Sequence, residues 1–347
     1  MEYHLSTTPI GPDVLPGLTD TAAPDGPGHA INTGYLWDQA FNAGLTVRDF
    51  GFFFDRINNA LPYPTNETVQ QGLPANERLL PNTDLYFRGF DQNNADYYLY
   101  QEWAHDVSVN GLANLTLLRL PHDHTGNYST ALAKVNAPEL QVADNDYAVG
   151  LVIDNIAHGP YAGNTLVFVI EDDAQNGADH VDAHRSIAFI VGPYVKQGGA
   201  VVSTQYNTIN FVRTIERVLG LGANHYTDAL AQPMADVFDT TQAAWTYNAA
   251  PSAYLYNTTL PLPAKSAGLV VPKPTHDVNY WAKVTKGMDF SKEDRVNPEA
   301  YNRILWRGLK GDIVYPGDAS LGETHARYKQ ALKQAKTAEP DNDGGED

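Results

Sequence analysis

Residues 165–186, TLVFVIEDDAQNGADHVDAHRS, decide how the chain is organised. The apolar run at 166–170 predicts a strand, because a strand buried in a parallel sheet is hydrophobic at successive positions. The loop after such a strand is where open α/β sheets bind ligands. This loop is crowded with ionisable side chains: Glu171, Asp172, Asp173, Asp179, His180, Asp182, His184 and Arg185. Groups packed this densely repel one another unless a cation holds them, so the loop predicts a metal or catalytic site rather than a solvated acidic loop.

A second cluster of ionisable residues follows another strand. The segment LTLLRL at 115–120 predicts a strand, and Asp123 and His124 come just beyond its end, with His122 beside them. One such residue at a strand end is usually a turn or cap. Two clusters at two strand ends instead predict a metal or phosphate contact.

The remaining patterns predict an α/β fold. A helix over about 32–43 leads into a strand at 45–54, and further helices are predicted at 142–159 and 206–219. With a strand after the acidic loop, IAFIVGPYV, the order from Leu115 is strand, helix, strand, loop, strand, helix. This order predicts a three-layer α/β/α sandwich with a mainly parallel sheet. Asp144 or Asp146 is expected to cap the helix at 142–159.

The chain is expected to form one domain. Residues 1–30 predict an extended arm, 31–335 the α/β domain, and 336–347 a disordered acidic tail. Within the domain, 55–110 is expected to be a cap or insertion with short helices, and 240–335 a C-terminal segment that wraps the surface and includes a helix at 298–310.

Composition narrows the classes of partner. The 347 residues carry a net charge of -18, which argues against nucleic acid and leaves a small phosphorylated substrate open. Without cysteine, the chain has neither disulfides nor thiolate metal sites. No apolar run is long enough to span a membrane, and the first residues, MEYHLSTTPIGPDVLPG, lack the pattern of a signal peptide.

The acidic loop fits metal-assisted phosphoryl chemistry best. A divalent cation held by Asp172 and Asp173 can polarise a phosphoryl oxygen. His180 and His184 can complete the shell or contact the phosphate, and Arg185 matches phosphate oxygens bidentately. A glycosidase would leave the histidines unexplained, an EF-hand needs a different spacing of carboxylates, and a serine hydrolase of the Gly-x-Ser-x-Gly type lacks its motif here.

At these residues the chain resembles a known family. The segments that carry the resemblance are GYLWDQAFNAGLTVRDFGFF, LPHDHT, VADNDYAVGLVIDNIAHGPY, EDDAQNGADHVDAHRS, DALAQPMADVF and NRILWRGLKG. They resemble bacterial phosphoesterases related to acid phosphatases and phospholipase C, within the alkaline phosphatase superfamily, whose domain often follows a β-propeller. The resemblance implies an α/β/α fold and metal-dependent hydrolysis of phosphoric esters. It implies Asp172 and Asp173 as metal ligands, with further site or neighbouring positions at Asp123, His124, Asp179, His180 and His184.

The chain departs from this family at its start. Family members begin the domain with a strand ending in Glu-Asn and then supply a Ser or Thr nucleophile, and neither feature is found here. We therefore expect an alkaline phosphatase-like domain that lacks its first strand-helix unit. The alternative to an active enzyme is an incomplete, truncated or split domain that binds a metal or phosphorylated ligand without turnover and needs a missing N-terminal segment or chain. The resemblance favours a periplasmic or secreted location.

Overall fold

The fold begins with a helix that leads directly into a strand. Helix α1 (Leu36–Asn42) ends before Gly44, whose φ of 76° is a conformation that glycine adopts without strain. Strand β1 (Val47–Phe50) follows and pairs in parallel with β2 (Leu115–Leu118). The predicted helix-strand unit and a parallel pair are thus confirmed. The computed structural model describes residues 35–52, 79–171, 186–224, 226–291 and 296–315.

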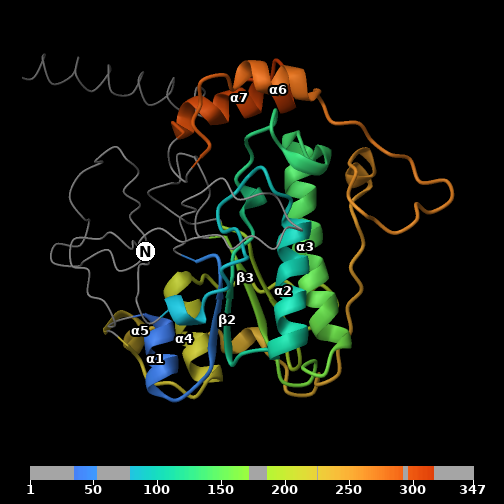
Figure 1. Cartoon of the computed structure of the whole chain (residues 1–347). Coiled ribbons are helices and arrows are strands. Elements are labelled where there is room, and N and C mark those ends of the chain that lie inside the picture. The colour runs from blue at the N-terminus through green and yellow to red at the C-terminus, as the bar shows by residue number, and fades with distance from the viewer. Residues whose placement is uncertain (1–34, 53–78, 172–185, 225, 292–295, 316–347) are drawn as a thin grey trace, which may run out of the picture. The chain divides into compact units, whose positions relative to one another are not determined.

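Two helices pack along one another beside these strands, as Figure 1 shows. They are α2 (Asp96–Asn110) and α3 (Pro138–His158). One hydrophobic cluster joins them to β1, and it contains Leu99, Trp103, Val152, Ile156 and Phe50. Trp103 is only 1% exposed, so α2 belongs to the core of the fold.

Helix α2 corrects the expectation of a cap with short helices over 55–110. Residues 96–110 form one helix of 15 residues, and its buried face mixes Leu99 and Trp103 with the acidic Asp96 and Asp106. A face of this kind leaves no clean apolar stripe in the sequence, which is why the pattern did not reveal a core helix.

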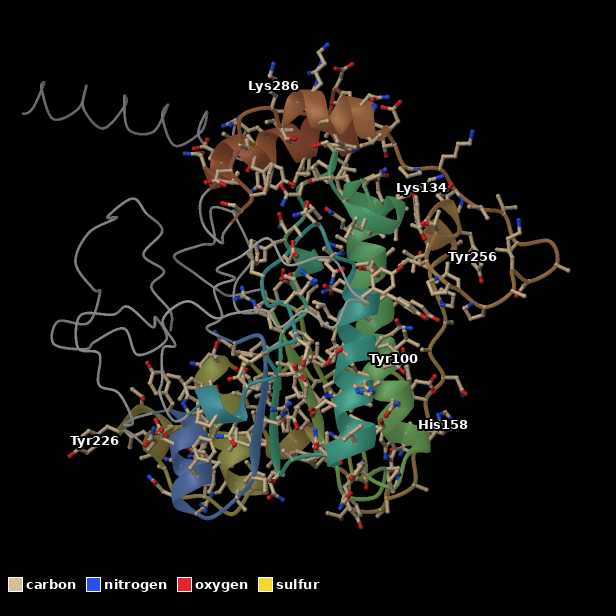
Figure 2. The ribbon with its side chains drawn as sticks, viewed as in Figure 1. Tyr100, Lys134, His158, Tyr226, Tyr256 and Lys286 are labelled. Atoms are coloured by element: carbon tan, nitrogen blue, oxygen red, sulfur yellow. The ribbon has the colours of Figure 1, made fainter. Side chains whose placement is uncertain are left out.

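Helix α3 confirms the helix predicted at 142–159 but begins earlier. Pro138 occupies its first turn, where a missing N–H costs nothing, and Asp144 and Asp146 lie inside the helix. The expectation that either residue caps α3 is therefore wrong. At the other end His158, labelled in Figure 2, pairs with Asp154 at 2.8 Å.

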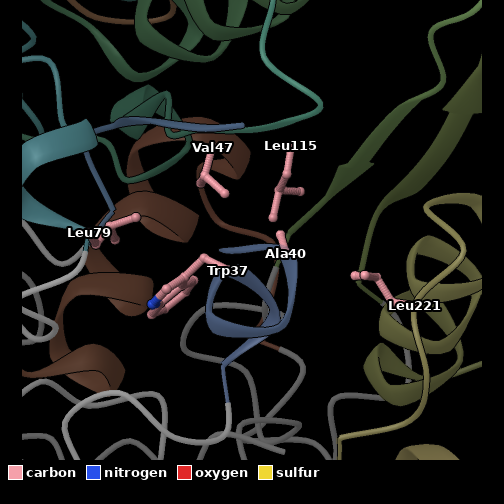
Figure 3. Packing of buried hydrophobic residues seen from close by; sticks show 6 residues of the cluster. All are labelled: Trp37, Ala40, Val47, Leu79, Leu115 and Leu221. Carbon is pink, nitrogen blue, oxygen red and sulfur yellow. The ribbon is translucent and has the colours of Figure 1, made fainter. Parts of the chain in front are cut away.

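Helices cover both faces of β2. Leu115 packs with Trp37 and Ala40 of α1 in the cluster of Figure 3, and Leu117 packs against the same cluster. Leu118 points to the other face and packs against the α2–α3 cluster. This alternation is the period of two that a strand imposes on its side chains. The α/β class is confirmed by this arrangement.

The second pair of strands is antiparallel. β3 (Val167–Ile170) pairs with β4 (Ala188–Val191) in that sense, so the mainly parallel arrangement holds for β1 and β2 and not for β3 and β4. The predicted helix at 206–219 is confirmed as α4 (Thr208–Val218). Phe211 of α4 packs edge-on against Phe168 of β3, with the ring centroids 6.2 Å apart.

The rest of the described chain is mostly irregular, with short helical turns. Residues from Glu299 onward belong to a second compact unit, which holds most of α7 (Pro298–Lys310), the helix predicted at 298–310. Among the described residues, no helix has both the length and the apolar character that crossing a membrane requires. The other elements are η1 (Leu80–Asn82), η2 (Pro121–Asp123), η3 (Leu132–Lys134), α5 (Tyr226–Leu230), η4 (Ala235–Val237), η5 (Ala253–Asn257) and α6 (Val278–Val284).

Candidate functional site

The acidic loop lies outside the described residues, and both of its ends lie inside them. The Glu171 N–H donates a hydrogen bond of 3.0 Å to the Ile187 carbonyl, so β3 and β4 stay paired up to the loop. The loop therefore connects two antiparallel neighbours, and its two ends are held side by side. Six predicted site residues fall within it and are not described: Asp172, Asp173, Asp179, His180, His184 and Arg185.

The other two predicted site residues lie at the end of β2. Asp123 is exposed, and His124 is half-buried. The His124 ring meets the Phe90 ring edge-on, with 5.3 Å between the ring centroids, and the Arg119 guanidinium lies 5.6 Å from the centroid of the Phe90 ring. Both residues are accessible to solvent in part, as a metal or phosphate contact at this strand end requires.

His122, the first histidine of this motif, is fully buried instead. Its Nδ1 lies 2.7 Å from Oδ2 of Asp144, and its Nε2 lies 3.2 Å from the carbonyl oxygen of Gln92. Its backbone N–H donates to Oδ2 of Asp96 at 3.0 Å. The histidine is thus held from three sides by elements that are far apart in the sequence.

The same two carboxylates organise the start of α2. Asp144 of α3 accepts hydrogen bonds from the backbone N–H groups of Asp96 (2.6 Å) and Tyr97 (3.2 Å). The first N–H groups of a helix lack partners within it, so Asp144 acts as a cap supplied by a neighbouring helix. Asn145 links the same region by donating 2.9 Å bonds to Oδ2 of Asp96 and to the Leu120 carbonyl.

These contacts define the protonation of His122. A carbonyl oxygen only accepts hydrogen bonds, so Nε2 must carry a proton toward Gln92, and an ionised Asp144 requires a second proton on Nδ1. Burial alone would lower the pKa of His122, but the charges of Asp96 and Asp144 and the hydrogen bonds raise it to about 9. His122 is therefore a buried imidazolium.

For Asp96, unlike His122, the effect of burial on the pKa outweighs that of the neighbouring charges and hydrogen bonds. Burial raises its pKa to about 7, against the attraction of the His122 charge and the hydrogen bond from Asn145. Its Oδ1 is buried without a hydrogen-bond partner in the described part of the chain. The cluster Asp96–His122–Asp144 thus carries one strong ion pair, His122 with Asp144, and a second carboxyl that titrates close to neutral pH.

The distances of this cluster permit a metal ion, and its hydrogen bonds oppose one. Asp96, His122 and Asp144 each offer a ligand atom, and these atoms lie within 4.8 Å of one another. A metal needs a free lone pair on the imidazole, but both ring nitrogens of His122 serve as donors. Binding of a metal ion would also remove Asp144 from its hydrogen bonds with the backbone N–H groups of α2. We interpret the cluster as a structural ion pair.

Sequence reasoning found His122 only as a neighbour of Asp123 and missed Asp96 and Asp144 as its partners. The available signal was a carboxylate at 144 among the buried positions of an otherwise apolar helix face. The residues that contact Asp144 are His122 and Asp96, which lie 22 and 48 positions away in the sequence. A local sequence pattern does not reveal partners so far apart.

Comparison of the chain with protein-family models and with curated proteins found no match.

The ion pair predicts a pH dependence of stability. The pKa of His122 is about 9 in the folded chain and 6.5 in an ordinary environment, so its contribution is complete below pH 6.5 and is lost as pH rises through 9. We expect the free energy of unfolding to fall over this window by on the order of 3 kcal/mol more in the wild type than in His122→Gln. Urea unfolding at several pH values measures the difference. Equal pH slopes in the two proteins would contradict a buried imidazolium.

Removing the partner carboxylate separates its two roles. We expect Asp144→Ala to lower the free energy of unfolding by about 3–5 kcal/mol, because it leaves His122 charged and unpaired and uncaps α2. Asp144→Asn retains an oxygen for the cap and should cost less. Asp146→Ala, an exposed carboxylate on the same helix, is the matched control and should change stability by less than about 0.5 kcal/mol. A loss at Asp144 no larger than at Asp146 would show that the cluster is not structural.

Proposed function

We propose that the chain carries a metal-dependent phosphoesterase site, of phosphatase or phosphodiesterase type, at the ends of β2 and β3. The fold around it belongs, on this proposal, to the alkaline phosphatase-like α/β/α sandwiches. The family resemblance of the sequence supports both statements, and the confirmed α/β class is compatible with them.

One structural observation carries the proposal. β2 and β3 each begin a few residues after the C-terminal end of a helix, α2 and α3 respectively, and these helices lie side by side with their N-terminal ends joined through Asp144. Both strands therefore run back toward those N-terminal ends, as Figure 1 shows. Asp123 and His124 follow one strand and Asp172 follows the other. On this proposal, the two ionisable clusters would lie toward the same end of the layer, where α/β folds bind ligands.

The proposed roles follow from the chemistry of each side chain. Asp172, Asp173 and Asp179 would hold a divalent cation together with Asp123, because hard cations prefer carboxylate oxygen ligands. When bound, the cation would neutralise charge that develops on the phosphoryl oxygens.

The basic residues of the proposed site have different tasks. Arg185 and His124 would orient the phosphate of a small phosphorylated substrate, since a guanidinium forms paired hydrogen bonds with its oxygens. His180 and His184 would complete the metal shell or transfer a proton to the leaving group.

A second candidate is binding without turnover. Among the described residues, β2 and β3 pair only with β1 and β4 respectively and not with each other. Separate strand pairs in the described part of the chain are compatible with an incomplete, truncated or split domain, in which metal or phosphate would bind at the loop but no nucleophile would complete the site.

A hydrolysis assay separates the two candidates. We expect the purified chain to hydrolyse an aryl phosphate with at least one of Mg²⁺, Mn²⁺, Ca²⁺ or Zn²⁺, and Asp172→Ala or Asp173→Ala to reduce the rate about a hundredfold or more. The control Asp146→Ala should keep full activity. Divalent-metal binding by calorimetry without hydrolysis would support the second candidate, and neither binding nor hydrolysis would refute both.

Metal removal should also destabilise the chain. Without a cation the adjacent carboxylates Asp172 and Asp173 repel one another, so we expect a chelator to lower the melting temperature by a few degrees at neutral pH. The double substitution of both residues by alanine should abolish this sensitivity. An unchanged melting temperature of the wild type in chelator would argue against a bound metal.

A further inference from the structure

The turn formed by residues 123–127, which carries Asp123 and His124, is held by two buried glutamines. Gln92 donates a hydrogen bond from Nε2 to the His124 carbonyl. Gln141 of α3 donates from Nε2 to the Gly126 carbonyl at 2.7 Å, and its Oε1 accepts from the Gly126 N–H at 2.8 Å. Neither glutamine is more than 2% exposed. The backbone of the 123–127 turn is therefore bound by side chains from two other segments of the chain.

A third support comes from a segment 163 positions further along the chain. Asn127 donates from Nδ2 to the Phe290 carbonyl at 3.3 Å. The Phe290 ring, which is 9% exposed, lies directly against Gly126. A methyl group at Gly126 would lie 2.8 Å from Cε1 of Phe290, which is well inside contact distance. Only glycine permits this close approach, so the ring and the turn fit together without spare room.

The backbone around Phe290 is itself fixed. Oδ1 of Asp289 accepts hydrogen bonds from the Ser291 N–H at 3.0 Å and from the Ser291 hydroxyl at 2.6 Å. An aspartate that bonds the residue two positions on closes a local turn, and here that turn encloses Phe290. Just before it, the preceding helix α6 places Trp281 against Tyr128, with 5.6 Å between the ring centroids. The segment that presents Phe290 is thus anchored beside the 123–127 turn at two points.

Two features of this arrangement reduce stability. Asn127 has a φ of 49°, which is uncommon for any residue other than glycine. Gln92 Oε1 is buried without a hydrogen-bond partner in the described part of the chain, and such an atom is unfavourable. Costs of this kind concentrate where the geometry of a segment serves a function. Both occur in the contacts that fix the residues next to Asp123 and His124.

We propose that Phe290 is a positioning residue for the candidate site. By filling the space against Gly126, its ring fixes the direction in which the Asp123 and His124 side chains leave the turn. The catalytic consequence rests on the proposed phosphoesterase function, whereas the positioning rests on the contacts alone. Phe290 acts through the backbone of the turn and has no part in binding the phosphate. A displacement of about 1 Å in a group that contacts the reacting phosphate can reduce the rate about a hundredfold.

Kinetics of Phe290→Ala test the catalytic consequence. The assay is aryl phosphate hydrolysis with the divalent metal that supports it, below the melting temperature of every variant. We expect Phe290→Ala to lower kcat/KM about tenfold or more, because the turn can shift into the vacated space. Phe290→Leu refills much of that space and should restore most of the rate.

Leu221→Ala is the matched control. Leu221 is 7% exposed and packs in the α1 cluster of Figure 3, so its truncation also leaves a buried cavity and should also lower the melting temperature. It should nevertheless keep kcat/KM within about twofold of the wild type, since surface and core changes away from a site alter stability without moving the reacting groups.

The position of the His124 ring is measured by NMR in the absence of metal. In the wild type its edge-on contact with Phe90, at 5.3 Å between centroids, should give nuclear Overhauser effects between the two rings. We expect these effects to be lost in Phe290→Ala and to persist in Phe290→Leu and Leu221→Ala. A role of Phe290 in stability alone would leave them unchanged in every folded variant.

The two measurements separate the positioning role from the proposed function. If the wild type hydrolyses no aryl phosphate, the phosphoesterase proposal fails, and the ring contact alone decides the role of Phe290. If it does hydrolyse, a kcat/KM of Phe290→Ala equal to that of Leu221→Ala overturns the positioning role. A contact between His124 and Phe90 that survives in Phe290→Ala overturns it in either case.

A second variant keeps the test decisive if Phe290→Ala does not fold. Asn127→Gly removes the hydrogen bond to the Phe290 carbonyl and tolerates the positive φ of this position. Loss of the contact between His124 and Phe90 in this variant supports the positioning role, and its full retention contradicts it.

Discussion

The ion pair of His122 with Asp144 is the interaction on which the arrangement of strands and helices depends. It ties the end of β2 to the interior of α3, and through the capping bonds of Asp144 it also ties α3 to the start of α2. Burying charges costs several kcal/mol per ion unless each is paired and hydrogen-bonded. Here backbone N–H groups and the Gln92 carbonyl complete the shell, so the charges specify one arrangement of three elements.

This constraint places the candidate site. Because His122 is held inside the core, the next two residues of the motif emerge at the surface, where Asp123 is exposed and His124 packs edge-on against Phe90. One motif thus has two functions. Its first histidine is part of the scaffold, and its last two residues lie closer to solvent.

In the described part of the chain, the strands are held by helices and form two separate pairs. Leu115 and Leu117 bind β2 to α1, Leu118 binds it to the α2–α3 cluster, and Phe168 binds β3 to α4. These side-chain contacts hold each strand pair against its helices.

Local sequence patterns predicted the helices and strands whose hydrophobic periodicity and end signals lie within their own residues. The strand after α1, the helix at 206–219 with its Asn207–Asn210 capping box, and the helix at 298–310 were each predicted, since their signals lie within a few residues. Helix α2 was missed because its buried face carries Asp96 and Asp106, whose partners lie elsewhere in the chain. The metal role of residues 172–185 stays a prediction.

The sequence by itself determined the order of strands and helices from β2 to α4, the α/β class, and the placement of ionisable clusters directly after two strands. The tertiary structure alone decided that β3 and β4 are antiparallel, that Asp144 caps a neighbouring helix and not its own, and that His122 is a buried cation. The reason is physical: hydrophobic periodicity and helix stops act between near neighbours, whereas strand pairing and the pairing of buried charges are settled between residues that only the folded chain brings together.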